Sequence, residues 1–241
     1  MAYRIQGLTI TEHLLQLAQR GNRPFTERLH PGIPGVLGVR LPDLRRLAKS
    51  IIKQGDLTRY LHEAEQSTSS PEEDFMEART LHGLVLGLAP VTSLEEYLLH
   101  LERWVCRINS WSVCDCFSLP QAKKLLSQHS DTLWLFFLDH LRRSEEYEVR
   151  FGVVALMQYF IDEEHIEQYL EVKHEGYYVR MALAWALAEC YIHHPEATHP
   201  YFTAKRFVPW VHNKAIQKIC ESYRISPETK AQLKLLRQPK G

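Results

Sequence analysis

The chain has 241 residues, of which 45% are hydrophobic and 24% charged, and its 29 Lys and Arg balance 29 Asp and Glu. Such a chain can bury a sizeable core, which excludes a disordered protein, and its zero net charge argues against a uniformly basic nucleic-acid binder. Residues 1–8 lack the apolar core of a signal peptide, and no apolar run is long enough to span a bilayer. We expect a single domain over residues 1–241, located in the cytoplasm.

Helix-start signals recur along the chain. Thr9 to Glu12 and Ser93 to Glu96 have the spacing of a capping box. Two further segments, Ser70-Pro71-Glu72-Glu73 and Ser226-Pro227-Glu228, place a proline and an acidic residue directly after an N-cap serine. Alternating β-branched residues bounded by hairpin turns are essentially missing. The sequence therefore predicts an all-α fold.

An internal repeat indicates how these helices are arranged. Tyr147-Glu148-Val149-Arg150 and Tyr177-Tyr178-Val179-Arg180 each open an apolar run, and the two arginines are 30 residues apart. Taking Arg79, Asp115, Arg150, Arg180 and Lys214 as equivalent points gives steps of 36, 35, 30 and 34 residues. Such periods are typical of stacked helix pairs. The sequence predicts a HEAT-like helical-repeat solenoid with a concave groove, although only the match between residues 147 and 177 rests on residue identity.

Cysteine and histidine residues give no metal-site pattern. The five cysteines are an odd count without paired C-x-x-C spacing, which favours free thiols in a reducing compartment. Pro195 and Pro200 are expected to place His193, His194 and His199 in a loop between helices. We expect no metal ion and no cofactor.

Charge is segregated along the chain despite its zero sum. Residues 1–59 carry ten Lys or Arg and four Asp or Glu, and residues 201–241 carry nine and two. Residues 60–103 and 145–175 each carry two basic and nine acidic residues. A basic groove in an otherwise acidic solenoid fits this pattern, and so does a solvated surface that follows helix-dipole preferences.

The strongest chemical constellation is Asn109-Ser110-Trp111-Ser112-Val113-Cys114-Asp115. If it is helical, Trp111 and Asp115 are neighbours on one face. The repeat register then brings Arg150 and Trp185 to the same concave side, with Arg79, Arg180 and Lys214 along the groove. Taken singly, each residue has a structural explanation: Trp185 could be a core residue of an alanine-rich helix, and Arg150 could only pair with Asp115.

Trp111, Asp115, Arg150 and Trp185, the last inside an Ala-x-x-Trp-Ala-Leu helix, together form a specific pattern. In these four positions the chain resembles the HEAT-like repeat DNA alkylation repair family, in particular its AlkD branch, from about Leu14 to about Ser226. The resemblance implies a DNA glycosylase that acts as a hydrolase on the N-glycosidic bond of N3- or N7-alkylated purines without base flipping. Its implied partner is duplex DNA, which the protein would bind as a monomer.

The resemblance also implies roles for the four residues. Asp115 would stabilise the oxocarbenium-like sugar and position the attacking water, because a carboxylate is most effective beside developing positive charge. Trp111 and Trp185 would pack their ring faces on that sugar. Arg150 would hold a phosphate, whose geometry suits a guanidinium group.

Three departures support a second hypothesis. Residues 31–38 are rich in helix breakers where active relatives carry a short helix with aromatic and basic residues, so this element is expected to be absent. Ala188 stands where another arginine is expected, and the net charge is zero. The alternative is a non-enzymatic HEAT-like scaffold that binds structured DNA or a protein partner. Because Asp115 and both tryptophans are retained, we favour the glycosylase.

Overall fold

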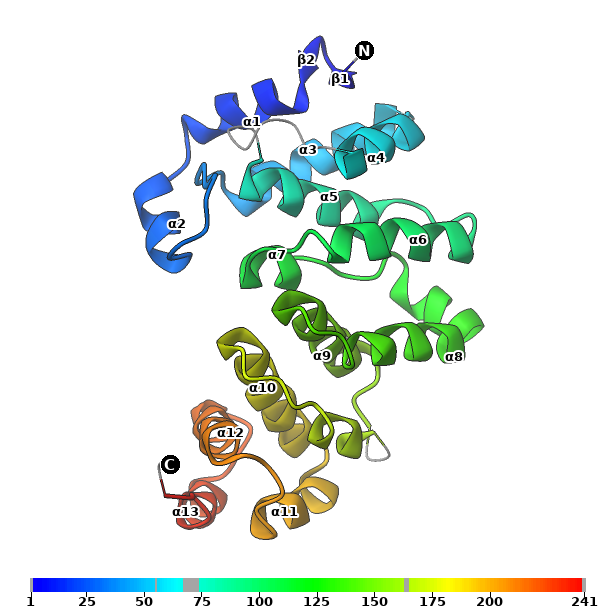
Figure 1. The fold of residues 1–241 in the computed structure, drawn as a ribbon. Coiled ribbons are helices and arrows are strands. Elements are labelled where there is room, and N and C mark those ends of the chain that lie inside the picture. Colours follow the sequence, from blue (N-terminus) through cyan, green and yellow to red (C-terminus); the bar gives the residue numbers. More distant parts are fainter. Residues whose placement is uncertain (1, 55, 67–73, 163–164, 240–241) are drawn as a thin grey trace. The chain divides into compact units, whose positions relative to one another are not determined.

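The computed structural model describes residues 2–54, 56–66, 74–162 and 165–239 (Figure 1). Its contacts divide the chain into two compact units, residues 1–128 and 129–241. The boundary coincides with a kink at His129, where φ is −141° and ψ is 30° inside helix α8. The single domain expected over residues 1–241 stays a prediction.

The first unit contains a small hairpin followed by helices. The elements are β1 (Arg4–Ile5), β2 (Leu8–Thr9), α1 (Ile10–Ala18), α2 (Arg23–Leu29), α3 (Leu41–Gln54), α4 (Leu57–Gln66), α5 (Met76–Leu88), α6 (Leu94–Val105), α7 (Trp111–Asp115) and the first part of α8 (Ala122–His140). Helix α5 is buried along most of its length and packs against α3, α6 and α7. It therefore forms the core of this unit.

The second unit continues from the kink in α8. It contains α9 (Glu146–Tyr159), the 3₁₀ helix η1 (Ile166–Leu170), α10 (Tyr177–His193), α11 (Pro195–Thr203), α12 (Pro209–Glu221) and α13 (Pro227–Leu235). Helix α10 packs between α9 and α12, as Figure 1 shows. The rings of Tyr147 and Tyr178, which open α9 and α10, lie 5.5 Å apart. The repeat seen in the sequence is thus a pair of stacked helices, and the all-α helical-repeat fold is confirmed.

The predicted helix starts are confirmed where the structure describes them. Glu12 N donates to Thr9 Oγ1 over 3.2 Å and Thr9 N donates to Glu12 Oε2 over 2.7 Å, which completes the capping box of α1. The hydroxyls of Ser93 and Ser226 accept backbone N–H groups at the starts of α6 and α13. The start predicted at residues 70–73 lies outside the described residues.

The structure adds one local feature that was not predicted, and it corrects one prediction. Residues 4–9 form a two-stranded antiparallel hairpin, because Gln6 and Gly7 both adopt positive φ angles that suit a tight turn. The segment from His193 to His199 is helical rather than a loop, since α10 ends at His193 and α11 begins at Pro195. A proline is compatible with the first position of a helix, where its missing N–H would have no partner.

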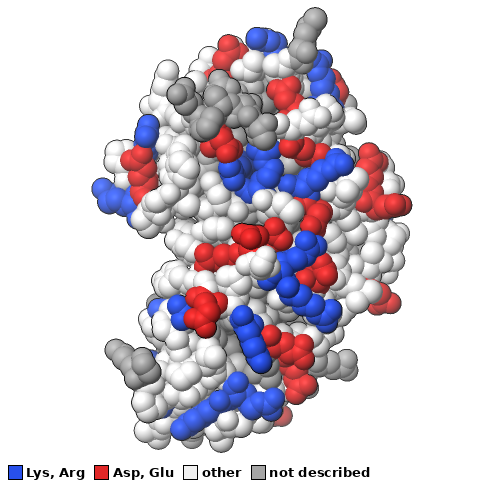
Figure 2. All heavy atoms as spheres, viewed as in Figure 1, with Lys and Arg blue, Asp and Glu red and all other residues white. Residues whose placement is uncertain are grey.

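Two further observations concern the length of apolar helices and the distribution of charge on the surface. Within the described ranges, no helix is both long and apolar enough to cross a membrane. On the face drawn in Figure 2, basic and acidic side chains are interspersed, so this view shows no large field of one sign. The charge segregation of the sequence therefore does not carry over to this face.

Candidate functional site

Helix α7 carries Trp111 and Asp115 at its two ends. The hydroxyl of Ser110 caps the helix by accepting a hydrogen bond of 3.3 Å from Val113 N. Val113 and Cys114 are buried, whereas Trp111 and Asp115 are half-buried. The predicted helical spacing of the two residues is therefore present, and both reach the surface of the first unit.

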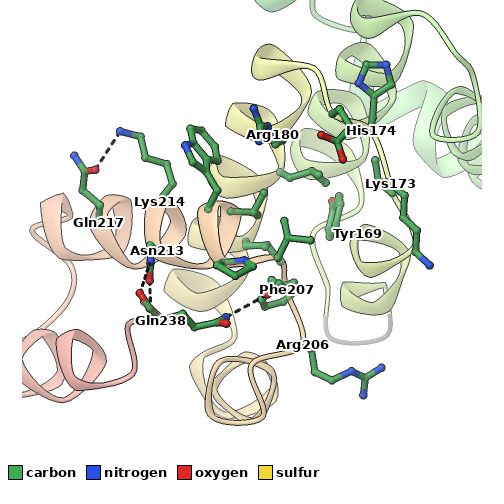
Figure 3. Close-up of a pocket in the computed structure, with 18 of the residues that line it drawn as sticks. Tyr169, Lys173, His174, Arg180, Arg206, Phe207, Asn213, Lys214, Gln217 and Gln238 are labelled. Carbon is green, nitrogen blue, oxygen red and sulfur yellow. Dashed lines mark hydrogen bonds between the residues drawn. The ribbon is translucent and has the colours of Figure 1, made fainter. Parts of the chain in front are cut away.

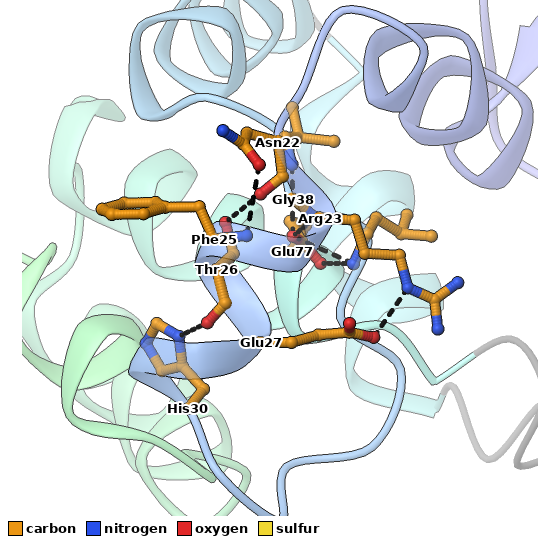
Figure 4. A network of polar contacts seen from close by, with 10 residues as sticks. Asn22, Arg23, Phe25, Thr26, Glu27, His30, Gly38 and Glu77 are labelled. Atoms are coloured by element: carbon orange, nitrogen blue, oxygen red, sulfur yellow. Dashed lines mark hydrogen bonds and ion pairs between the residues drawn. The ribbon is translucent and has the colours of Figure 1, made fainter.

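Trp111 packs against the end of α2, far away in the sequence. Its ring is stacked on His30, with centroids 5.1 Å apart and planes at 11°, and its Nε1 donates to the carbonyl of Leu29 over 3.3 Å. His30 in turn bonds through Nδ1 to the carbonyl of Thr26 at 2.8 Å (Figure 4). One face of the Trp111 ring is thus covered within the protein.

Helix α2 precedes the segment in which a short aromatic and basic helix was expected to be absent. Residues 31–38 are non-helical as predicted, but α2 lies directly before them. Phe25 on α2 is 49% exposed, and the guanidinium of Arg28 lies 6.0 Å from its ring centre. Asn22 caps the helix through a 3.1 Å bond from Phe25 N, and Pro24 stands in its first turn. An exposed aromatic ring and a cation therefore stand on α2, next to the segment that the sequence predicted to be non-helical.

A buried carboxylate fixes the chain that follows α2. Glu77 is 2% exposed, and its Oε1 accepts from Gly38 N over 2.6 Å and from Val39 N over 3.3 Å, while its Oε2 accepts from Leu37 N over 3.0 Å. Gly38 has a φ of +79°, and its carbonyl accepts from Asn22 N over 3.0 Å (Figure 4). Glu77 therefore holds residues 37–39 in place, and Gly38 among them contacts Asn22 at the start of α2.

Asp115 lies beside the thiol of Cys116, and the charge of Arg45 also acts on that thiol. Burial raises the pKa of the neighbouring Cys116 thiol to about 12, and the Asp115 charge contributes in the same direction. The positive charge of Arg45 on α3 acts against this rise in the pKa of Cys116 and so lies near the same place. Arg45 is exposed. Nothing local in the sequence connects α3 with α7, so the sequence did not predict Arg45 as a site residue.

In the second unit, Arg150 lies in the first turns of α9 and is only 6% exposed. Its Nη1 donates to the carbonyl of Tyr178 over 2.8 Å, so the repeated arginine binds the first turn of the next repeat. The guanidinium also lies close to Lys218 of α12, because it contributes to lowering the pKa of that amine, whose main cause is burial.

Trp185 on α10 lines a hollow of about 420 Å³. Its Nε1 donates to Glu189 Oε1 over 3.3 Å, and Lys218 and Arg224 line the same hollow. Ala188, which stands where an arginine was expected, is 2% exposed there. The two basic side chains of this hollow therefore come from α12 and the residues after it, and the carboxylates of Glu189 and Glu221 also line it.

The three additional basic residues of the prediction are placed differently. Arg79 is part of the interior of the first unit: its Nε donates to Asp74 Oδ1 over 3.1 Å and its Nη1 to the Arg107 carbonyl over 2.6 Å. Arg180 and Lys214 line a second, larger hollow of unit two, separate from the hollow at Trp185. Whether residues of the two units face one groove stays a prediction.

Among the described residues, no cluster of three His, Cys, Asp or Glu side chains is arranged to hold a metal ion. The family model described as DNA alkylation repair enzyme matches residues 10–219, which include α1 to α11 and most of α12. The chain belongs to the DNA alkylation repair enzyme family. Neither the curated proteins nor the solved structures contain a significant match to it.

Membership of the DNA alkylation repair family gives the chain a role in DNA alkylation repair and makes DNA its partner. The matched segment contains all of the residues singled out above on α7, α9 and α10.

Proposed function

We propose that this protein is a glycosylase that hydrolyses the N-glycosidic bond of N3- or N7-alkylated purines in duplex DNA without base flipping. The observation that supports this best is the pair on α7, where Trp111 and Asp115 both reach the surface inside the family segment. Alkylation gives the purine a positive charge, so the base leaves as a neutral molecule. A carboxylate can then assist without an acid on the opposite side.

The proposed reaction assigns Asp115 to the sugar. When the C1′–N9 bond breaks, its electron pair goes to the base and positive charge gathers on the deoxyribose. The Asp115 carboxylate stabilises that charge and orients the water that adds to C1′, whose released proton passes to the carboxylate or to solvent. Trp185 packs on the sugar, and the uncovered face of Trp111 does the same.

Phosphate binding is assigned to basic residues on both units. Arg150 with Lys218 beside it would hold one phosphate, and Arg45 near Asp115 would hold another. Arg79 would act indirectly, since its bonds to Asp74 and the Arg107 carbonyl stabilise the unit that carries α7. The proposal therefore needs few phosphate contacts, in keeping with a chain of zero net charge.

A non-enzymatic scaffold that binds structured DNA or a protein is the second candidate. The stack between Trp111 and His30 favours it, because one ring face and the Nε1 of this tryptophan already have partners inside the protein. The two candidates differ in what purified protein does to methylated duplex DNA. Release of 7-methylguanine and 3-methyladenine above the spontaneous rate supports the glycosylase, and duplex binding without release supports the scaffold.

A further inference from the structure

A large hollow lies wholly inside the second unit, between the N-terminal halves of α10 and α12 (Figure 3). Its volume is about 1200 Å³. Leu183, Leu187, Phe207 and Val211 give it an apolar floor, and all four are part of the buried core. Ligand pockets commonly measure about 300–1000 Å³, so this hollow is too large for a single phosphate ion.

Basic side chains surround this hollow. They come from five segments of the unit and are Lys173, Arg180, Arg206, Lys214 and Arg237, whereas Glu175 is the only carboxylate among the described residues of the lining. None of the five forms an ion pair with a carboxylate in the part of the chain that the structure describes. The buried Nε of Arg180 has no hydrogen-bond acceptor there. Five cations against one carboxylate in the described lining, together with an unsatisfied donor, favour an anionic ligand.

Aromatic rings continue along the edge of this hollow. The guanidinium of Arg180 lies 5.1 Å from the ring centre of Trp210, and the Tyr177 ring packs edge-on against Trp210 at 5.9 Å. Tyr177 is 54% exposed and Trp210 is 36% exposed. Tyr178 then connects Tyr177 with Tyr147, with ring centres 5.3 and 5.5 Å apart. A row of aromatic residues thus runs across the starts of α9, α10 and α12.

The helical repeat produces this row together with its cations. In α10 the first turn offers Tyr177 and, three residues later, Arg180, and in α12 it offers Trp210 and, four residues later, Lys214. Residues three or four apart lie on one helix face, so each repeat presents an aromatic ring beside a positive charge. A ligand that matches this surface repeats an aromatic ring and a negative charge along its own length.

We propose that the hollow at Arg180, Trp210 and Lys214 binds a short single-stranded segment of nucleic acid. Its bases would pack on Trp210 and Tyr177, and its phosphates would lie against Arg180 and Lys214. This binding surface is separate from the residues assigned to excision, because Arg180, Leu183 and Leu187 follow one face of α10 whereas Trp185, Ala188 and Glu189 line the other hollow. The inference does not depend on glycosylase activity.

The test measures binding of a fluorescein-labelled oligothymidylate to the full-length protein by fluorescence anisotropy. Trp210→Ala is expected to weaken binding roughly tenfold or more, and Trp210→Phe should restore most of it because it retains an aromatic face. Lys214→Gln should lower the dependence of log affinity on log salt by about 0.7, the value for one phosphate of a single strand. Lys234→Gln, at an exposed position of α13 outside the lining of the hollow, serves as the matched control and should bind the oligomer with the salt dependence of the wild type.

Competition decides between nucleic acid and other anions. Unlabelled oligothymidylate should displace the probe, whereas polyglutamate and inorganic phosphate at the same charge concentration should not. The inference is overturned if the wild type does not bind the oligomer, if Trp210→Ala and Lys214→Gln both bind it normally, or if polyglutamate competes equally well. Far-ultraviolet circular dichroism of each variant checks the fold, and the salt dependence of Lys214→Gln keeps the test valid if Trp210→Ala is misfolded.

Discussion

Glu77 offers a sharp test of how the first unit supports its surface. Its carboxylate accepts backbone N–H groups of Leu37, Gly38 and Val39, and Gly38 also receives the N–H of Asn22 at the base of α2. Glu77→Gln keeps the shape of the side chain and removes its charge. We therefore expect the segment of residues 30–40, and with it the partner of Trp111, to open more easily.

The magnitude follows from the three accepted bonds. A hydrogen bond to a charged acceptor contributes about 1.5–3 kcal/mol and one between neutral groups about 0.5–1.5, so each bond that loses the charge weakens by about 1 kcal/mol. The bond from Val39 N, at 3.3 Å, is longer than those from Gly38 at 2.6 Å and Leu37 at 3.0 Å and so contributes less. We expect the free energy of local opening to fall by about 2–4 kcal/mol, with allowance for the amide NH₂ that replaces one acceptor.

Hydrogen–deuterium exchange of the full-length protein measures this opening directly. Protection of peptides covering residues 30–40 should fall roughly 30- to 1000-fold, since about 1.4 kcal/mol corresponds to a factor of ten. Glu95→Gln is the matched control, because Glu95 is exposed in the first turn of α6 and should leave these peptides unchanged. Wild-type protection in the Glu77→Gln protein would refute the assigned role of the carboxylate.

Two further substitutions test charge at other positions. Arg150→Ala should weaken duplex binding and lower the dependence of log affinity on log salt by about 0.9, whereas Lys123→Ala, an exposed residue of α8, should not; equal salt slopes for both would exclude a phosphate contact of Arg150. Burial, with Arg107 and His100 nearby, lowers the pKa of His82 to about 3, so the unfolded chain binds a proton that the native state does not between about pH 6.5 and pH 3. The free energy of unfolding should therefore fall as the pH drops through this window, and His82 should contribute up to about 1.4 kcal/mol per pH unit to that fall. His82→Leu should remove this contribution. If urea unfolding of His82→Leu shows the same pH dependence as that of the wild type, the neutral buried state of His82 is contradicted.

The sequence revealed most where the signal is local or repeated. The Thr9 to Glu12 box and the serine before Pro227 specify helix starts through contacts three residues apart, and the structure contains both. The match between Tyr147 and Tyr177 predicted two equivalent helices because each repeat must bury the same face against its neighbour. These features need no knowledge of distant contacts.

Long-range contacts explain what the sequence did not reveal. Trp111 contacts His30 and Leu29, which lie about eighty residues earlier in the chain. Glu77 accepts hydrogen bonds from a segment about forty residues before it. Neither pairing leaves a local pattern in the sequence. Helix α11 forms in spite of Pro200, because Thr198 and Phe202 are fully buried and tertiary packing outweighs local propensity. The positive charge near Trp185 likewise comes from a neighbouring repeat rather than from α10 itself.

The central claim is that Asp115 assists excision of an alkylated purine, and single-turnover release of 7-methylguanine from duplex DNA tests it most directly. Asp115→Asn keeps the side-chain shape and should slow release by about 10²- to 10³-fold, or roughly 3–4 kcal/mol, while binding to undamaged duplex stays equal or improves. Asp131→Asn, at an exposed position of α8, is the matched control and should release the base at the wild-type rate. Release by Asp115→Asn at the rate of the wild type, or no release by the wild type above the spontaneous rate, would contradict the account.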